Sequence, residues 1–304
     1  MNKIKLWWKA GRPFSFTVSV VPPILGSVIA VNENMGLKIN WLYFVLTLFG
    51  CFLAHAGSNI FSDYFDYKNR VDREGTYGSS GVLVEKLLTP MQMFWGAMVP
   101  FAIAAAIGLF FVFTLPEGKS LIWLIALGGF LGFFYTTAPF VLKYRALGDF
   151  AVFFAFGPGM TLGVYFVQAG HYSWTPFLYS IPAALLVDAI LHSNNLRDIK
   201  NDGVVNIKTA AMLLGEGGAK GMYYALIGGA YLVTIALVIF YQLTWISLIT
   251  LLSLPIAIKL INTVRNKAQI PEKDFAMIDA KTAQFHSAFC ILFIASLLIS
   301  RWTS

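Results

Sequence analysis

The stretch Asn194-Asn195-Leu196-Arg197-Asp198-Ile199-Lys200-Asn201-Asp202 closes a long apolar run and places polar side chains in a regular order. If the run continues as a helix, Asn194, Asp198 and Asp202 fall at positions i, i+4 and i+8, on one face. Carboxylates at the C-terminal end of a helix face the negative end of its dipole, which is unfavourable unless a cation offsets it. The stretch therefore predicts a helix whose last turns present oxygen atoms to a cation.

A second stretch has the same form. Asn59, Asp63 and Asp66 fall at i, i+4 and i+7, and they close the apolar run of residues 41–60. Carboxylate and amide oxygens suit Mg²⁺, which often keeps several waters and bridges to phosphate oxygens. Each motif alone is equally well explained as an ordinary solvated helix end. Together, the two motifs predict a pair of acidic clusters that hold a diphosphate through Mg²⁺.

The composition is that of an integral membrane protein. Of the 304 residues, 58% are hydrophobic and only 12% are charged, whereas a soluble domain usually carries about 25% charged residues. About 20 apolar residues cross a bilayer as a helix. We therefore expect an all-α polytopic protein with nine membrane-spanning helices in a single membrane domain over residues 1–304. The expected spans are residues 15–31, 41–59, 91–114, 121–139, 149–168, 174–194, 221–241, 245–261 and 282–302.

The basic residues predict how the protein sits in the membrane. With the N-terminus in the cytoplasm, all but three of the 22 Lys and Arg residues fall in cytoplasmic segments, the exceptions being Lys38, Lys119 and Arg301. This is the positive-inside pattern. It assigns much of the net charge of +7 to topology and membrane lipids, and it argues against a nucleic-acid partner. We expect a multi-pass protein of the cell (inner) membrane whose acidic motifs both face the cytoplasm.

Basic side chains lie in the same expected cytoplasmic mouth as the two motifs. They are Lys143, Arg145, Arg197 and Lys208. Acids that hold a metal and bases that bind the remaining phosphate oxygens suit a metal–diphosphate. Arg197 points away from the acidic face of its helix, so pairing with Asp198 is an equally good interpretation of this residue.

Asp188 lies deeper in the span that ends in the second motif, and His192 follows it by four residues. Ionisable groups inside a membrane helix are costly and are candidates for function. An Asp188–His192 pair facing the bundle interior and a catalytic base are the two interpretations within an enzyme. A proton relay at the same pair would instead indicate a membrane transporter. The main acidic clusters lie at helix ends, however, whereas transporter sites lie near the bilayer midplane.

The two motifs, Asn59-x-x-x-Asp63-x-x-Asp66 and Asn194-x-x-x-Asp198-x-x-x-Asp202, resemble the paired signature of the UbiA superfamily of intramembrane prenyltransferases. The likeness is closest to the 1,4-dihydroxy-2-naphthoate polyprenyltransferase branch, from which Ser62 and Asp188 depart. The further stretches that carry the resemblance are Arg12-Pro13, Asp63-Tyr64-Phe65-Asp66-Tyr67-Lys68 with Asp72, Ser80-Gly81-Val82, Leu142-Lys143-Tyr144-Arg145-Ala146-Leu147-Gly148-Asp149, and Lys208-Thr209.

The resemblance implies a helical bundle around a central cavity, capped on the cytoplasmic side, with a lateral opening for an isoprenoid tail. It implies Mg²⁺-dependent transfer of a polyprenyl group from polyprenyl diphosphate to a small aromatic acceptor. The acceptor of the closest branch is 1,4-dihydroxy-2-naphthoate, which loses CO₂ in menaquinone biosynthesis. Other acceptors of the superfamily stay open, namely 4-hydroxybenzoate, chlorophyllide or a glycerol-phosphate lipid.

The resemblance and the residue types together assign roles to two sets of side chains. The expected Mg²⁺ ligands are Asn59, Asp63, Asp66, Asn194, Asp198 and Asp202. The four aspartates of this set are also the expected catalytic residues. The expected substrate-binding residues are Lys143, Arg145, Lys208, Arg197, Lys68, Arg12 and Tyr135.

Overall fold

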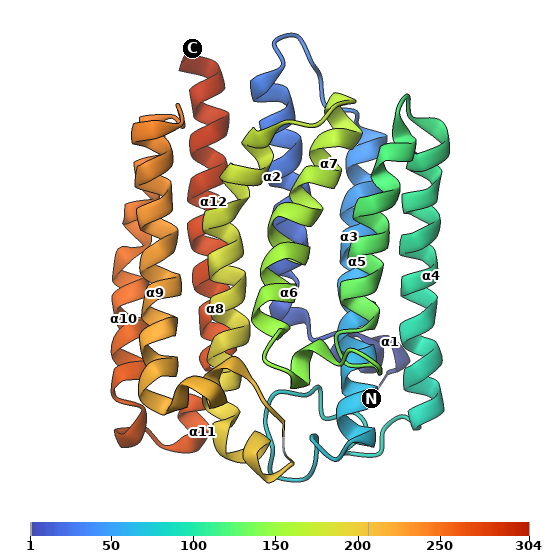
Figure 1. The fold of residues 1–304 in the computed structure, drawn as a ribbon, viewed down its shortest axis with the longest axis vertical. Coiled ribbons are helices and arrows are strands. Elements are labelled where there is room, and N and C mark those ends of the chain that lie inside the picture. Colours follow the sequence, from blue (N-terminus) through green and yellow to red (C-terminus); the bar gives the residue numbers. More distant parts are fainter. Residues whose placement is uncertain (1, 206, 304) are drawn as a thin grey trace.

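The computed structural model describes residues 2–205 and 207–303 as a bundle of long helices (Figure 1). Within these described residues no β-strand forms, and Arg145 and Lys208 pair only as an isolated bridge. The expected all-α fold is confirmed. The helices are α1 (Lys3–Ala10), α2 (Thr17–Glu33), α3 (Trp41–Lys68), α4 (Pro90–Thr114), α5 (Ile122–Phe133), α6 (Gly148–Phe154), α7 (Met160–Ala169), α8 (Trp174–Val204), α9 (Ala210–Phe240), α10 (Leu254–Arg265), α11 (Glu272–Phe275) and α12 (Ile278–Thr303).

Eight helical stretches of the described chain are long and apolar enough to cross a membrane. The remaining expected span, residues 121–139, forms a shorter apolar helix, Gly118–Phe133. At about 1.5 Å per residue this helix is shorter than the roughly 30 Å hydrocarbon core of a bilayer. It ends at Phe133 because the chain then folds back on itself: the Leu142 N–H donates to the Phe134 carbonyl at 3.1 Å and the Lys143 N–H to the Tyr135 carbonyl at 2.8 Å.

The two helices that carry the acidic motifs begin with side-chain caps. Asn40 accepts a backbone hydrogen bond at the start of α3, and Ser173 does so at the start of α8. Such caps satisfy N–H groups that have no partner within the helix. α3 continues to Lys68 and α8 to Val204, well past their apolar runs. Both motifs are therefore helical, as the spacing predicts.

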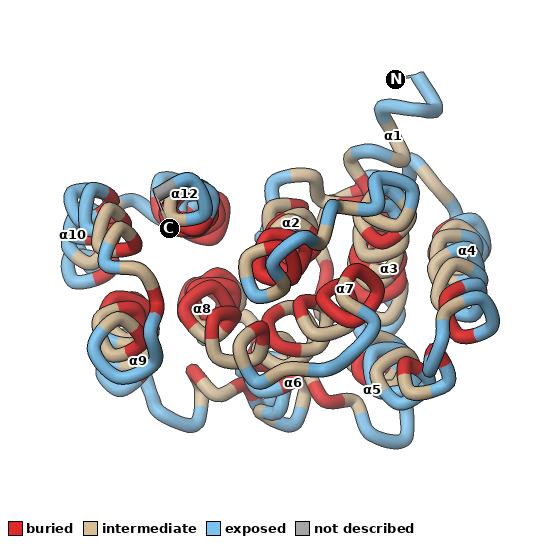
Figure 2. Tube along the Cα trace, turned by 90° about the horizontal axis from the view of Figure 1, so that it is seen from above, coloured by how far each residue is buried: buried red, intermediate tan, exposed pale blue. Residues whose placement is uncertain are grey.

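The bundle has a buried interior and an exposed edge (Figure 2). In the most apolar window of the α2 span 78% of the residues are buried, against 17% for α4. α8 packs against α9 and α12, α2 packs against α7, and α3 packs against α4. α2 and α8 are thus structural centres of the bundle, whereas α4 presents an apolar outer surface suited to lipid.

The span Gly148–Ala169 changes its helical geometry in the middle. α6 passes into a π-helical segment, Ala155–Gly159, before α7 begins. A Cβ atom on Gly157 would lie 2.3 Å from Cβ of Ala184, so glycine allows the segment to approach α8 this closely. A π-helical turn shifts the register of the side chains around it. The contact with α8 therefore sets the direction of the neighbouring side chain, Phe156.

Candidate functional site

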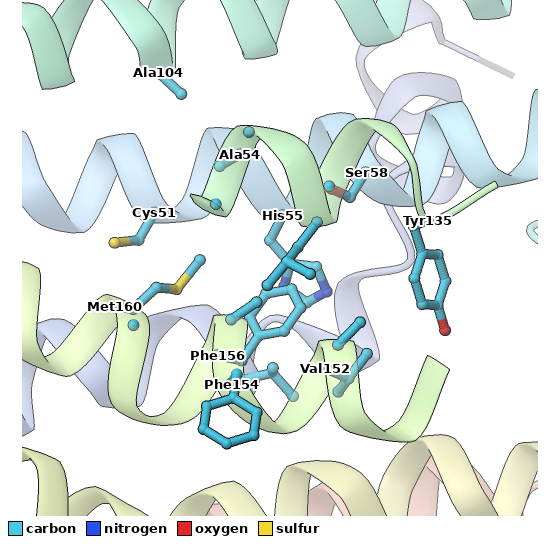
Figure 3. A pocket seen from close by; sticks show the side chains of 18 of the residues that line it. Cys51, Ala54, His55, Ser58, Ala104, Tyr135, Val152, Phe154, Phe156 and Met160 are labelled. Atoms are coloured by element: carbon cyan, nitrogen blue, oxygen red, sulfur yellow. The ribbon is translucent and has the colours of Figure 1, made fainter. Parts of the chain in front are cut away.

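A cavity of about 440 Å³ lies among α3, α4, α5 and the Gly148–Ala169 span. Its apolar part is lined by residues such as Phe101, Ile107 and Leu124, and its polar part lies toward the ends of α3 and α8 that carry the motifs. Figure 3 shows part of the wall, with His55 from α3 beside Phe156, and with Met160 and Ser58 on either side of this pair. The polar lining side chains are Arg12, Ser15, Thr47, His55, Ser58, Asn59, Ser62, Tyr135, Lys143, Asn194, Asn195 and Asp279.

Asp63 of the first motif is buried and binds a base from the N-terminal segment. The Arg12 guanidinium forms an ion pair with one carboxylate oxygen, and Ser80 donates to the other through its hydroxyl and, at 3.0 Å, through its backbone N–H. Burial lowers the pKa of Arg12, but the nearby carboxylates of Asp63 and Asp72 outweigh burial and raise this pKa above its usual value. Arg12 is therefore a permanent cation beside the first motif.

Asp66 accepts hydrogen bonds from three side chains. They are the ammonium of Lys143 at 2.5 Å, the hydroxyl of Tyr144 at 2.5 Å and the hydroxyl of Ser62 at 3.1 Å. Burial lowers the pKa of Lys143, but the Asp66 carboxylate outweighs burial, so the net pKa is raised. Burial and the same carboxylate raise the pKa of Tyr144. Both groups thus stay protonated as donors beside Asp66.

The loop that follows α3 reaches from the first motif to the second. Gly78 has a φ of +96°, and a Cβ atom there would lie 2.6 Å from the Arg197 guanidinium and 3.0 Å from an Asp198 carboxylate oxygen. Only glycine fits both the conformation and the space. Two residues later, Ser80 binds Asp63. The loop therefore brings backbone into contact with both motifs at the polar end of the cavity.

Arg197 is held by acidic partners. Its guanidinium donates to both carboxylate oxygens of Asp198 at 2.9 and 2.7 Å, to Asp279 at 2.8 Å and to the Ala276 carbonyl at 2.9 Å. These contacts use donors on each of its three nitrogens. The geometry therefore favours the ion-pair interpretation of Arg197, which orients Asp198, over a direct phosphate contact.

Lys143 lies between the two motifs. Besides its bond to Asp66 on α3, it interacts electrostatically with Asp198 and Asp202 on α8. The first motif's Asn59 donates its side-chain amide to the Gly11 carbonyl at 2.9 Å and to the Ser15 hydroxyl at 3.1 Å. Because the amide nitrogen is fixed in this way, the amide oxygen of Asn59 is the atom available to a cation.

The remaining predicted substrate-binding residues fall into two groups. Arg12 and Tyr135 line the cavity. Lys68, Arg145 and Lys208 are exposed, and none of them lines the cavity. The fold joins two of these outer residues, because Arg145 and Lys208 lie on paired backbone segments. Basic charge therefore exists in an inner layer beside the acids and in an outer layer at the surface.

The carboxylate and amide oxygens of the two motifs are of the type that Mg²⁺ prefers. Several of these carboxylates are paired with Arg or Lys side chains. Over residues 2–205 and 207–303, no group of three or more His, Cys, Asp or Glu side chains is arranged to hold a metal; Asp63, Asp66 and Asp198 instead pair with bases. Burial and the nearby Asp66 and Asp63 carboxylates raise the pKa of Asp72 to about 8. This marks an excess of negative charge that a divalent cation would relieve.

The prediction that His192 pairs with Asp188 is wrong, because the carboxylate partner of His192 is Asp149. His192 lies 3.1 Å from Asp149 through Nδ1 and donates from Nε2 to the Ala219 carbonyl at 2.9 Å. Asp188 interacts electrostatically with Asp149 as well, and its buried Oδ1 has no hydrogen-bond partner within the described part of the chain. The i,i+4 spacing places Asp188 and His192 on the same side of α8, but α6 supplies a carboxyl group between them. The three side chains form one buried cluster that joins α6, α8 and α9.

Some side chains of the site carry no sequence signal of their own. Tyr144 and Ser80 lie within stretches that resemble the family, but their contacts with Asp66 and Asp63 depend on how two loops fold. Asp279 stands at the start of α12 and reaches Arg197, and no spacing links it to either motif. His55 is a buried histidine of α3 that lines the cavity, and it belongs to neither motif.

Comparisons with known proteins cover nearly the whole chain. The model of the UbiA prenyltransferase family matches residues 20–300. The "UbiA prenyltransferase domain-containing protein 1 homolog" of Drosophila melanogaster is 32% identical over 295 residues, which cover 97% of this chain and 79% of the relative. The 1,4-dihydroxy-2-naphthoate octaprenyltransferase of Bacillus subtilis (strain 168) is 31% identical over 298 residues, which cover 97% and 93%.

Solved structures share the fold at low sequence identity. The apo structure of a UbiA homologue from Aeropyrum pernix K1 has a TM-score of 0.68 at 14% identity, and the match covers 93% of this chain and 97% of that one. A UbiA homologue from Archaeoglobus fulgidus bound to DMAPP and Mg²⁺ has a TM-score of 0.62 at 14% identity, with 94% and 99% covered.

Proposed function

This chain belongs to the UbiA prenyltransferase family, and we propose that it transfers a polyprenyl group from a polyprenyl diphosphate to 1,4-dihydroxy-2-naphthoate. The proposal rests on a cavity with apolar walls whose polar end is lined by Asn59 and Asn194, one residue from each motif. The four motif aspartates are not among the lining residues and lie further along the same two helices, α3 and α8. Such a cavity matches a substrate with a charged head and a long apolar tail. The 31% identity with the Bacillus subtilis octaprenyltransferase supports this acceptor.

We propose that both motifs hold Mg²⁺, directly or through water. The Archaeoglobus fulgidus homologue, which was solved with DMAPP and Mg²⁺, supports this assignment. When bound, Mg²⁺ supplies Lewis-acid stabilisation of the negative charge that develops on the diphosphate. The residues that would hold it are Asn59, Asp63, Asp66, Asn194, Asp198 and Asp202.

The bases of the site then act on the diphosphate in two layers. Arg12 and Lys143, which line the cavity, bind its oxygens and neutralise charge as the allylic C–O bond breaks. Arg145, Lys208 and Lys68 form the exposed layer, where they attract the anionic head before it enters. Arg197 acts on the substrate indirectly by fixing the Asp198 carboxylate.

The apolar part of the cavity protects the reacting carbon. When the C–O bond breaks, its electron pair leaves with the diphosphate and the allylic carbon becomes cationic. Apolar walls exclude water, so they keep this cationic carbon from being hydrated. A ring carbon of the acceptor attacks it and then loses its proton, while the ring carboxylate leaves as CO₂ and a proton takes its place. Tyr135 lines the cavity, and we assign it a contact with the acceptor.

We propose that the chain is one membrane domain with its active site toward the cytoplasm. The eight apolar spans make it a multi-pass membrane protein, and the positive-inside pattern supports a cytoplasmic N-terminus. The loops that contain Ser80 and Lys143 would cap the polar end of the cavity from that side. Protease protection of tags placed in these loops in oriented vesicles would test the orientation.

The proposed reaction is tested in membranes that contain the protein. They are incubated with Mg²⁺, a labelled polyprenyl diphosphate and, in parallel, 1,4-dihydroxy-2-naphthoate or 4-hydroxybenzoate, with an EDTA control. We expect a prenylated, decarboxylated naphthol that forms only with Mg²⁺. Product from 4-hydroxybenzoate alone would keep the reaction and overturn the acceptor. Transport of an intact substrate across the vesicle without any prenylated product would overturn the reaction.

A further inference from the structure

His55 is an aromatic, polar side chain in an otherwise mostly apolar part of the cavity wall. It projects from α3 toward Phe156, and both line the cavity (Figure 3). The two ring centroids are 4.7 Å apart and the rings are inclined by 63°, an edge-to-face arrangement. Phe16 contacts the His55 ring as well, with centroids 5.8 Å apart, but Phe16 is absent from the cavity wall. One aromatic neighbour of His55 therefore faces the cavity and the other does not.

The His55 ring is fixed by two serines. Its Nδ1 lies 3.1 Å from the Ser19 hydroxyl, and its Nε2 lies 3.4 Å from the Ser15 hydroxyl. Each serine donates its own proton to a backbone carbonyl, at 2.8 Å for Ser15 and 3.2 Å for Ser19, so a neutral ring, which has one N–H, donates to one serine and packs against the other. The imidazole is thus held from behind, and what it offers to the cavity is a fixed ring surface.

His55 lies on α3 close to the place where the diphosphate head of the substrate is proposed to bind. His55 precedes Asn59 by one helical turn, a rise of about 6 Å at 1.5 Å per residue. Asn59 is the first-motif residue nearest to it, and both line the same cavity. A diphosphate bound at the motifs would therefore place the first isoprene unit of its tail at the level of His55.

Phe156 reaches the same level from the Gly148–Ala169 span and packs directly against the His55 ring, so the two rings form one continuous surface. Its segment is the π-helical turn whose Gly157 packs against Ala184 of α8, so its backbone cannot retreat from the cavity without breaking that contact. An aromatic ring within about 6 Å of a cation attracts it through the negative face of the ring. A pair of rings at this level would also displace water from the reacting carbon.

We propose that His55 and Phe156 form the wall against the first isoprene unit and determine how the allylic cation is partitioned between the acceptor and water. The inference rests on the proposed function. In the productive step the C–O bond to diphosphate breaks, a C–C bond to the acceptor ring forms and the ring proton leaves. In the side reaction water forms the new C–O bond and loses a proton, which yields the prenyl alcohol.

The partition is measured with labelled geranyl diphosphate, Mg²⁺ and 1,4-dihydroxy-2-naphthoate, as the ratio of geraniol to prenylated product. Phe156→Leu and His55→Ala are expected to raise this ratio at least about threefold. Phe16→Leu is the matched control, because it removes the same ring chemistry beside His55 but outside the cavity, and its ratio should equal that of the wild type. Thermal unfolding in detergent checks that each variant is folded.

The variant His55→Phe distinguishes shielding of the allylic cation from a general loss of protein stability. It keeps an aromatic ring, and the serine hydroxyls retain their carbonyl acceptors, so the ratio should return toward the wild-type value. Ratios for Phe156→Leu and His55→Ala that match Phe16→Leu would overturn the inference, as would a high geraniol ratio for His55→Phe. A wild-type protein that neither transfers nor hydrolyses geranyl diphosphate would reject the proposed function instead.

Discussion

Lys143 offers the sharpest test of how the site uses charge. Its ammonium lies 2.5 Å from Asp66 and it lines the cavity between the two motifs. Lys143→Met keeps most of the unbranched apolar stem of the side chain and removes the ammonium group, with its charge and its hydrogen bond to Asp66. Asp66 retains hydrogen bonds from Tyr144 and Ser62, so its carboxylate keeps two of its three donors and the variant should fold.

The expected loss is in the chemical step. Removing one preorganised donor that stabilises charge in a transition state costs about 10²–10³ in kcat, which is about 3–4 kcal/mol. Breaking a buried ion pair costs up to about 3–5 kcal/mol of stability, but the side chain of Lys143 is 20% exposed and Asp66 stays hydrogen-bonded. The loss of folding stability should therefore be below about 3 kcal/mol. The rise in the activation free energy should be about 3–4 kcal/mol.

In the proposed mechanism Asp66 binds both Lys143 and Mg²⁺. The Mg²⁺ dependence of the variant therefore shows whether Lys143 acts on the leaving diphosphate or on the metal site. Lys143→Met should lower kcat about a hundredfold without raising the Mg²⁺ concentration needed for half-maximal rate. Lys200→Met is the control, since Lys200 is an exposed lysine near the second motif. A normal kcat with a much higher Mg²⁺ requirement would refute the reasoning, because Lys143 would then organise the metal site and not the leaving group.

The remaining predictions concern the motifs, the outer bases and the tail. Asp63→Asn and Asp198→Asn should each lower turnover by about a hundredfold or more in folded protein; near-normal rates in either would exclude a two-motif metal site. Arg145→Ala combined with Lys208→Ala should raise KM for the diphosphate a few-fold at low salt only, and a salt-independent fall in kcat would contradict this. A Cβ on Gly128, which lines the cavity, meets nothing within 4 Å. Gly128→Phe should therefore reduce turnover of octaprenyl diphosphate about tenfold relative to geranyl diphosphate, and equal losses would argue against a tail at this position.

Periodicity predicts much of the fold because membrane helices obey local rules. A bilayer leaves no water for backbone groups, so long apolar runs have to be helical, and the motifs at their ends stay on the same helices. The span at residues 121–139 is where this reasoning fails. Its composition is apolar throughout, but hydrogen bonds between segments on either side of Pro139 end the helix at Phe133.

Side-chain partners across helices are less accessible from sequence. The spacing of Asp188 and His192 suggests a pair, but it contains no information about Asp149, which approaches from α6. The two interpretations of Arg197 differ only in what surrounds its guanidinium. Asp279 on α12 helps to decide between them, and it lies 82 positions away in the chain.

The sequence by itself determined the membrane class, the helical architecture and the spacing of the Asn and Asp side chains on α3 and α8, because hydropathy and helical periodicity act over a few turns of one helix. The tertiary structure decided which base meets which acid: Arg12 meets Asp63, Lys143 meets Asp66, and Arg197 meets Asp198 and Asp279. It also decided that an aromatic wall stands one turn from the first motif. Most of these contacts join elements that are distant in sequence. They depend on how the helices pack and on where the loops run, and neither can be read from a local sequence pattern.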